Sequence, residues 1–146
     1  MADLSTIKQL DQWMTDNCYN DNYAIGDRNI HEGLGLDKFG SLFVWYYTER
    51  GQRENLKYFP TEKEAVEFAF KQITSDKFAD RHLIGFLSDK SIKLELLNEL
   101  DNRTIGYWTD EIPYGGINNP KYRVFVFGCD FKRAVDLKAK YYMDDK

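Results

Sequence analysis

The sequence is poor in the residues that build metal sites and disulfide frameworks. It has two histidines and two cysteines among 146 residues. Two cysteines are too few for a disulfide scaffold and, with so little histidine, too few for a structural zinc site. We therefore predict no metal and no cofactor, and we expect Cys18 and Cys129 to be free thiols in a reducing cytosol.

Long apolar segments are also missing. Nowhere do 18 apolar residues follow one another, as a membrane-spanning helix requires. The first thirteen residues lack the basic start and the apolar stretch of a signal peptide. We therefore expect a cytoplasmic protein that makes no contact with a membrane.

The chain has no excess of basic residues. It carries 24 Asp and Glu against 20 Lys and Arg, a formal net charge of −4. The acidic excess lies in residues 1–73, which hold 12 acidic and 8 basic side chains. Proteins that bind nucleic acid usually have a basic surface, so we expect no nucleic-acid ligand.

The pattern of apolar and turn-forming residues predicts an α+β fold, and the length is typical of a single domain spanning residues 1–146. Helices are expected over 4–14, 61–73, 75–87, 89–100 and 130–142. Strands are expected over 23–26, 30–36, 41–48, 54–59, 104–112 and 122–127, the first four as an antiparallel meander. Because strands and helices are segregated along the chain, we predict a mostly antiparallel sheet of about five or six strands with about four helices packed on it.

Two helix starts carry capping signals. Thr61 and Glu64 match the pattern in which a threonine caps a helix and a glutamate three residues later caps in return. Thr6 and Gln9 have the same spacing. These positions predict where the first two helices begin.

The sequence motif that comes nearest to a catalytic signature is incomplete. His31-Glu32 begins like a zinc-protease motif, but Gly35 stands where its second histidine belongs. We therefore predict a protein without enzymatic activity. The alternative is a small cytoplasmic enzyme that uses His31 or His82 in acid/base chemistry, near a carboxylate or Cys129.

Aromatic residues, in contrast, are abundant, with ten Tyr, ten Phe and three Trp. Tyrosine and tryptophan are common anchors of protein interfaces. The segment 107–116 combines such residues with two carboxylates and a loop, so we predict Trp108, Asp110, Glu111 and Tyr114 as partner-binding residues. If its strand alternates, Trp108 and Asp110 share one face and Glu111 lies on the other. The alternative is that these aromatic residues pack in the core.

Three motifs in the segment 23–73 stand out: Phe43-Val44-Trp45-Tyr46-Tyr47-Thr48, the following Glu49-Arg50-Gly51, and Phe59 with Thr61-Glu62-Lys63-Glu64-Ala65 at a helix start. In these motifs the segment resembles small immunity proteins of bacterial polymorphic toxin systems. Glu49-Arg50-Gly51 also predicts the end of a hairpin in which Gly51 takes a positive φ.

The resemblance implies a cytoplasmic protein that binds the C-terminal domain of a cognate toxin and occludes its active site, without chemistry of its own. An acidic and aromatic surface suits a basic toxin domain, because carboxylates accelerate encounter with a basic partner. A further alternative is a regulatory module that binds a peptide along an open sheet edge. The oligomeric state is left open.

Overall fold

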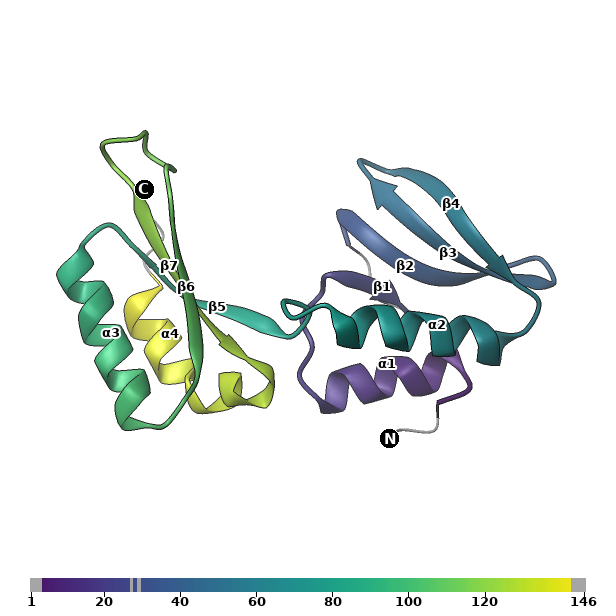
Figure 1. Cartoon of the computed structure of the whole chain (residues 1–146), viewed down its shortest axis with the longest axis horizontal. Coiled ribbons are helices and arrows are strands. Elements are labelled where there is room, and N and C mark those ends of the chain that lie inside the picture. Colours follow the sequence, from purple (N-terminus) through teal and green to yellow (C-terminus); the bar gives the residue numbers. More distant parts are fainter. Residues whose placement is uncertain (1–3, 27, 29, 143–146) are drawn as a thin grey trace. The chain divides into compact units, whose positions relative to one another are not determined.

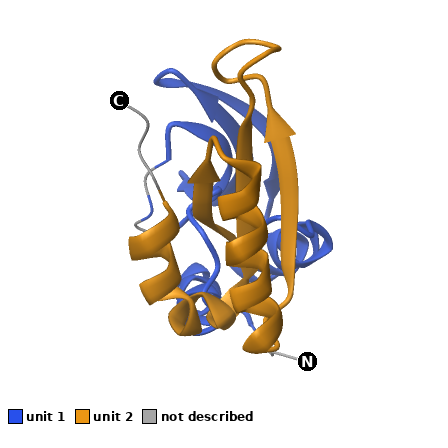
Figure 2. Ribbon diagram, turned by 90° about the vertical axis from the view of Figure 1, so that its left-hand side faces the viewer, with its two compact units in different colours: residues 1–79 blue, residues 80–146 orange. Residues whose placement is uncertain are grey.

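The computed structural model describes residues 4–26, 28 and 30–142 and has an α+β fold. The chain divides into two compact units, residues 1–79 and 80–146, which Figure 2 shows in different colours. Each unit has its own sheet. The described residues form seven strands in two sheets, where the sequence predicts about five or six strands.

The first unit pairs a four-stranded sheet with two helices. Its elements follow one another as α1 (Ile7–Asp16), β1 (Tyr23–Ile25), β2 (Glu32–Phe39), β3 (Leu42–Glu49), β4 (Gln52–Phe59) and α2 (Glu62–Ser75). The strand order is β1-β2-β3-β4, so β4 is an edge strand. Both helices lie on the same face of the sheet (Figure 1).

The core of this unit fills the space between the sheet and the helices. Trp45 on β3 stacks on Tyr23 of β1 and meets Phe68 of α2 edge-on, with ring centroids 5.6 Å apart. The buried aliphatic residues around these rings are Leu10, Met14, Ile25, Leu36, Ala65, Val66, Ala69 and Ile73. The strand predicted at 41–48 is therefore confirmed as β3, and it contributes to the core.

Both predicted threonine caps are confirmed, and at Thr6 the predicted return cap is present as well. The Thr6 side chain accepts a hydrogen bond from the backbone N–H of Gln9, and the Gln9 side chain caps in return. The Thr61 hydroxyl accepts from the backbone N–H of Glu64 at 3.2 Å. The carboxylate of Glu62 reaches from α2 to the N-terminus of α1, where it accepts from the backbone N–H of Ile7 at 2.8 Å. The first turn of α2 thus also joins the two helices.

The antiparallel meander is correct for β2, β3 and β4, but wrong for the first strand. β1 runs parallel to β2, with Tyr23 opposite Leu34. Gly26, directly after β1, has a φ of +67°, and a Cβ there would lie 2.8 Å from a carboxylate oxygen of Asp11. The left-handed backbone and the close approach to α1 both require glycine at this point.

The second unit also places two helices on one face of a sheet (Figure 1). Its elements are β5 (Arg81–Leu87), α3 (Lys90–Asn102), β6 (Tyr107–Ile112), β7 (Lys121–Phe127), a 3₁₀ helix over Gly128–Arg133 and α4 (Val135–Tyr141). The strand order is β5-β7-β6, and both pairings are antiparallel. The buried apolar side chains between its layers are Ile84, Leu87, Leu96, Leu100, Ile105, Val124, Val126, Ala134, Leu137 and Tyr141.

The helix expected over 75–87 is wrong, because most of this segment forms β5. Asp76 has a side chain that could cap a helix, but it closes a local turn in which its carboxylate accepts from the backbone N–H of Phe78. Gly85 then lies so close to α3 that a Cβ would be 2.6 Å from a methyl group of Leu96. The turn signal is real, and tertiary packing makes the following segment a strand.

The helix expected over 130–142 is correct only in its second half. The chain first forms the 3₁₀ helix, and α4 begins at Val135 without a side-chain cap. Asp130 does not cap α4; its carboxylate pairs with Arg133 at 3.3 Å within the 3₁₀ segment. The expected helix over 89–100 is confirmed as α3, with Asp89 as its cap.

The expectation of free thiols is wrong. Cys18 and Cys129 both lie in the described part of the chain, and neither thiol is free. The cysteines therefore give no support to a reducing compartment.

Among the described residues, no helix combines the length and the apolar character needed to cross a membrane.

Candidate binding site

Two carboxylates lie opposite each other at one end of the first unit's sheet. The antiparallel register pairs Glu32, the first residue of β2, with Glu49, the last residue of β3. Both side chains are exposed. Like charges directly opposite each other on neighbouring strands destabilise a sheet. Within the described ranges no lysine or arginine forms an ion pair with either carboxylate.

The two carboxyl groups interact directly. A hydrogen bond between them and their mutual repulsion raise the pKa of Glu49 above its ordinary value. The hydroxyl of Tyr47, two residues earlier on β3, donates to the Glu32 carboxylate at 3.2 Å. Partial desolvation and the neighbouring Glu32 raise the pKa of the Tyr47 hydroxyl. Negative charge is therefore concentrated at this point of the surface.

The turn after Glu49 has an uncommon backbone. Arg50 and Gly51 are its two central residues, and both have positive φ, +52° and +78°. Two positive φ values in a two-residue hairpin loop are typical of a type I′ turn, which matches the twist of the flanking strands. The positive φ expected for Gly51 is confirmed. Arg50 is the unexpected residue, because a non-glycine side chain in this conformation stores strain of the kind often found at functional sites.

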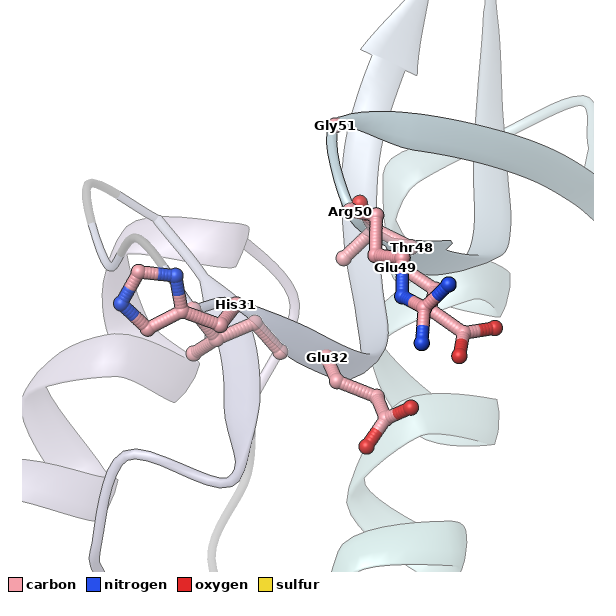
Figure 3. A pocket seen from close by; sticks show the side chains of 7 residues that line it. His31, Glu32, Thr48, Glu49, Arg50 and Gly51 are labelled. Carbon is pink, nitrogen blue, oxygen red and sulfur yellow. The ribbon is translucent and has the colours of Figure 1, made fainter.

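These residues line an open depression with a volume of about 600 Å³. Figure 3 shows Glu32, Glu49 and Arg50 around it, with the imidazole of His31 on its far side, directed away from the Glu32 carboxylate. Ile30, Thr48 and Gly51 complete the lining. We call Glu32 and Glu49, with the depression that they line, the carboxylate site. What this arrangement can do chemically is hold a cationic group.

The sequence-predicted residues lie in the second unit, on the edge strand β6 and the loop that follows it. Trp108 pairs with Phe125 of β7, and Asp110 pairs with Arg123, so the two predicted residues share a face as the alternation requires. The Asp110 carboxylate binds the guanidinium of Arg123 through two hydrogen bonds, one of them 2.8 Å long. Its charge is therefore already matched within the sheet.

Glu111 is separated from Trp108 and Asp110 by the sheet, whereas Tyr114 lies toward their face. Glu111 is exposed and pairs with Tyr122, which by alternation puts it on the opposite face of the sheet. Tyr114 lies in the loop, 66 % exposed, and contacts the ring of Phe86 edge-on at 5.2 Å. Phe86 lies opposite Arg123, as Asp110 does, so three of the four predicted residues lie toward one face of the sheet and Glu111 lies on the other.

Sequence reasoning missed the cations that cover the aromatic face of this sheet. The guanidinium of Arg81 lies 4.2 Å from the ring centre of Phe125 and 5.2 Å from that of Trp108. The other predicted histidine, His82, stacks on Phe131 with ring centroids 4.5 Å apart. A cation on one strand and a ring on another carry no shared sequence signal, so only the strand pairing could have revealed these contacts.

Sequence reasoning also missed the carboxylate site. Glu32 and Glu49 are 17 positions apart, whereas the sequence patterns that indicate paired carboxylates cover neighbours along a helix or a strand. The signal that could have found the pair is the hairpin itself. Once a tight turn at Gly40 and Ser41 is assumed, the register counts back from it and places Glu32 opposite Glu49.

No protein-family model matches this chain, and neither a curated protein nor a solved structure matches it. Within the described residues, no group of three or more His, Cys, Asp and Glu side chains is placed to hold a metal ion.

Proposed function

We propose that this chain is an immunity protein, which binds and inhibits a cognate bacterial toxin domain, and that the carboxylate site receives a lysine or arginine of that toxin. The observation that carries the proposal is the placement of Glu32 and Glu49 directly opposite each other, with no cation of the described chain paired to them. The toxin is a protein partner, and no nucleic acid, membrane or cofactor takes part.

The electrostatics favour a cationic ligand. Bringing two carboxylates together costs free energy in the unbound protein, and a cation placed between them removes this repulsion while gaining attraction to both. Arginine suits the site best, because its planar guanidinium can donate hydrogen bonds to two carboxylate oxygens at once. The acidic excess of residues 1–73 also attracts a basic partner at long range.

The resemblance supports the particular kind of partner. Glu49-Arg50-Gly51, which carries part of the resemblance to immunity proteins, forms the strained turn at the rim of the carboxylate site. An inhibitor that occludes an active site needs a protruding element with a defined backbone, and a type I′ hairpin turn provides one. The cytoplasmic location belongs to this proposal.

The residues predicted from the sequence keep a secondary place in it. Trp108, Glu111 and Tyr114 stay predicted contact residues. Asp110 is the least suited of the four, because its carboxylate is bound by Arg123. The enzymatic alternative through His31 or His82 and the peptide-binding alternative also stay predictions.

Co-expression with the toxin domain encoded beside this chain's gene tests the function. We expect cells that make both proteins to grow and cells that make the toxin alone to die. The variant carrying Glu32→Gln and Glu49→Gln should lose most of the protection. Equal death with and without the wild-type chain would refute the proposal.

A matched control separates the site from the overall charge. Glu64 and Glu67 are exposed on α2, so Glu64→Gln with Glu67→Gln makes the same change in net charge elsewhere in the same unit. This control should protect as well as the wild type. If both double variants lose protection equally, net charge rather than the carboxylate site governs binding.

A further inference from the structure

The edge strand β4 has a pattern that is symmetric about its own centre. β4 pairs only with β3, and six of its eight residues are exposed. A bulge separates Asn55, which lies opposite Tyr46, from Lys57, which lies opposite Trp45, so that Leu56 is the extra residue. The bulge changes which face of the sheet each later residue occupies.

The residues before the bulge alternate in the usual way. Arg53 lies opposite Thr48 and its guanidinium covers the ring of Tyr46 at 3.6 Å, which places it on the face away from the helices. Glu54 lies opposite Tyr47, which is two residues from the core residue Trp45 and so shares its face. Glu54 therefore lies on the helix-covered face.

The residues after the bulge repeat this order in reverse. The ammonium group of Lys57 lies 4.8 Å from the ring centre of Phe68 on α2, so Lys57 is on the helix-covered face. Tyr58 lies opposite Val44 and meets Phe39 edge-on, on the other face. Reading outward from the point between Asn55 and Leu56, both halves of β4 thus present the same sequence of faces.

The geometry points to β4 as a dimerisation strand that pairs antiparallel with β4 of a second copy of this chain, about a two-fold axis between Asn55 and Leu56. In that register Glu54 lies opposite Lys57 of the partner copy, and Arg53 lies opposite Tyr58. Antiparallel partners must lie on the same face of a sheet, and the bulge is what lets these pairs satisfy that condition. The two four-stranded sheets then form one continuous sheet.

Charge complementarity selects the second copy as the occupant. Each Glu54 meets a Lys57, and symmetry provides this pair twice, whereas an unrelated strand would leave these charges unmatched on an edge. The same pairing covers apolar surface, since Leu56 and Tyr58 are 48 % and 47 % exposed in the single chain. An isologous contact of this kind closes at two copies and leaves no further β4 edge open.

Sedimentation equilibrium of the purified full chain, with charge-reversal variants, tests the dimer. We expect the wild type to be dimeric. Glu54→Lys places lysines opposite Lys57 twice, and Lys57→Glu places glutamates opposite Glu54 twice, so each should raise the dissociation constant at least about tenfold, or 1.4 kcal/mol. The variant with both substitutions exchanges the charges and should restore the dimer.

Three outcomes overturn the inference. They are a monomeric wild type, single reversals that leave the dissociation constant unchanged, and a double variant that stays as dissociated as either single one. Glu67→Lys, which makes the same charge change on α2, is the control and should stay dimeric. Far-ultraviolet circular dichroism establishes whether each variant is folded. If one single variant does not fold, the double variant with exchanged charges still tests the register.

Discussion

At the scale of single residues, the molecule places like charges together where most proteins separate them. Glu32 and Glu49 face each other across two strands, and the pKa of Glu49 is raised as a result. Folding thus brings together two groups that repel each other when both are ionised. A cost of this kind is retained only where something else gains from it, which is why we assign the pair to binding.

Glu49→Gln tests the repulsion through pH. Because the pKa of Glu49 is higher in the folded protein than in the unfolded chain, the folded state holds more protons between the two pKa values, and the free energy of unfolding falls as pH rises through that window. Glu49→Gln has no carboxyl group at this position, so its free energy of unfolding does not fall in this window. We expect it to be more stable than the wild type at pH 7, with the difference closing below about pH 4, as measured by urea denaturation.

The Glu67→Gln variant serves as the comparison, since Glu67 is exposed on α2. Its difference from the wild type should not change over the same pH range. A Glu49→Gln variant that is less stable than the wild type at pH 7 would show that Glu32 and Glu49 do not repel each other in the folded protein.

Gly35 is the second residue at which a small change should have a large effect. A Cβ at this position would lie 2.6 Å from the ring of Tyr46 and 2.8 Å from the Cβ of Ala24. Gly35→Ala should therefore lower the free energy of unfolding by about 1–3 kcal/mol, the usual cost of overpacking. Gly106→Ala is the control, because nothing lies within 4 Å of a Cβ there. Equal stability of the two variants in denaturant would contradict this account of the packing.

At the scale of elements, the ion pair between Asp110 and Arg123 fastens the edge strand β6 to β7. The two side chains are 23 % and 27 % exposed, so water screens the pair only in part. Asp110→Ala leaves a half-buried guanidinium without its partner and should cost about 1–3 kcal/mol. Its neighbour provides the comparison, since Glu111 is exposed and Glu111→Ala should change stability by less than about 0.5 kcal/mol. Thermal or chemical denaturation of both variants decides whether Asp110 is structural.

The elements also show what local sequence can and cannot predict. The caps at Thr6 and Thr61 act between residues three apart, so the sequence predicted both helix starts correctly. The parallel direction of β1 and the strand β5 depend on neighbours far along the chain, such as Leu34 for Tyr23. Arg123 and Asp110 are also distant in sequence, so their ion pair was not predicted. For the same reason the pairing of Glu32 with Glu49 was not predicted.

At the scale of the whole molecule, the proposals concern two neighbouring parts of one sheet. The carboxylate site lies at the turn where β3 passes into β4, and the proposed dimer contact is centred on the bulge within β4. The α+β class was predicted from the segregation of strands and helices, which is a property of the whole sequence. The division into two sheets was not predicted, because strand order depends on long-range pairing.

Calorimetric titration of the toxin domain into this protein tests the central claim most directly. We expect the wild type and the Glu64→Gln, Glu67→Gln control to bind with the same dissociation constant. The Glu32→Gln, Glu49→Gln variant should bind at least about tenfold more weakly, a loss of 1.4 kcal/mol. Equal affinity of all three proteins for the toxin domain would contradict the assignment of Glu32 and Glu49 to the interface.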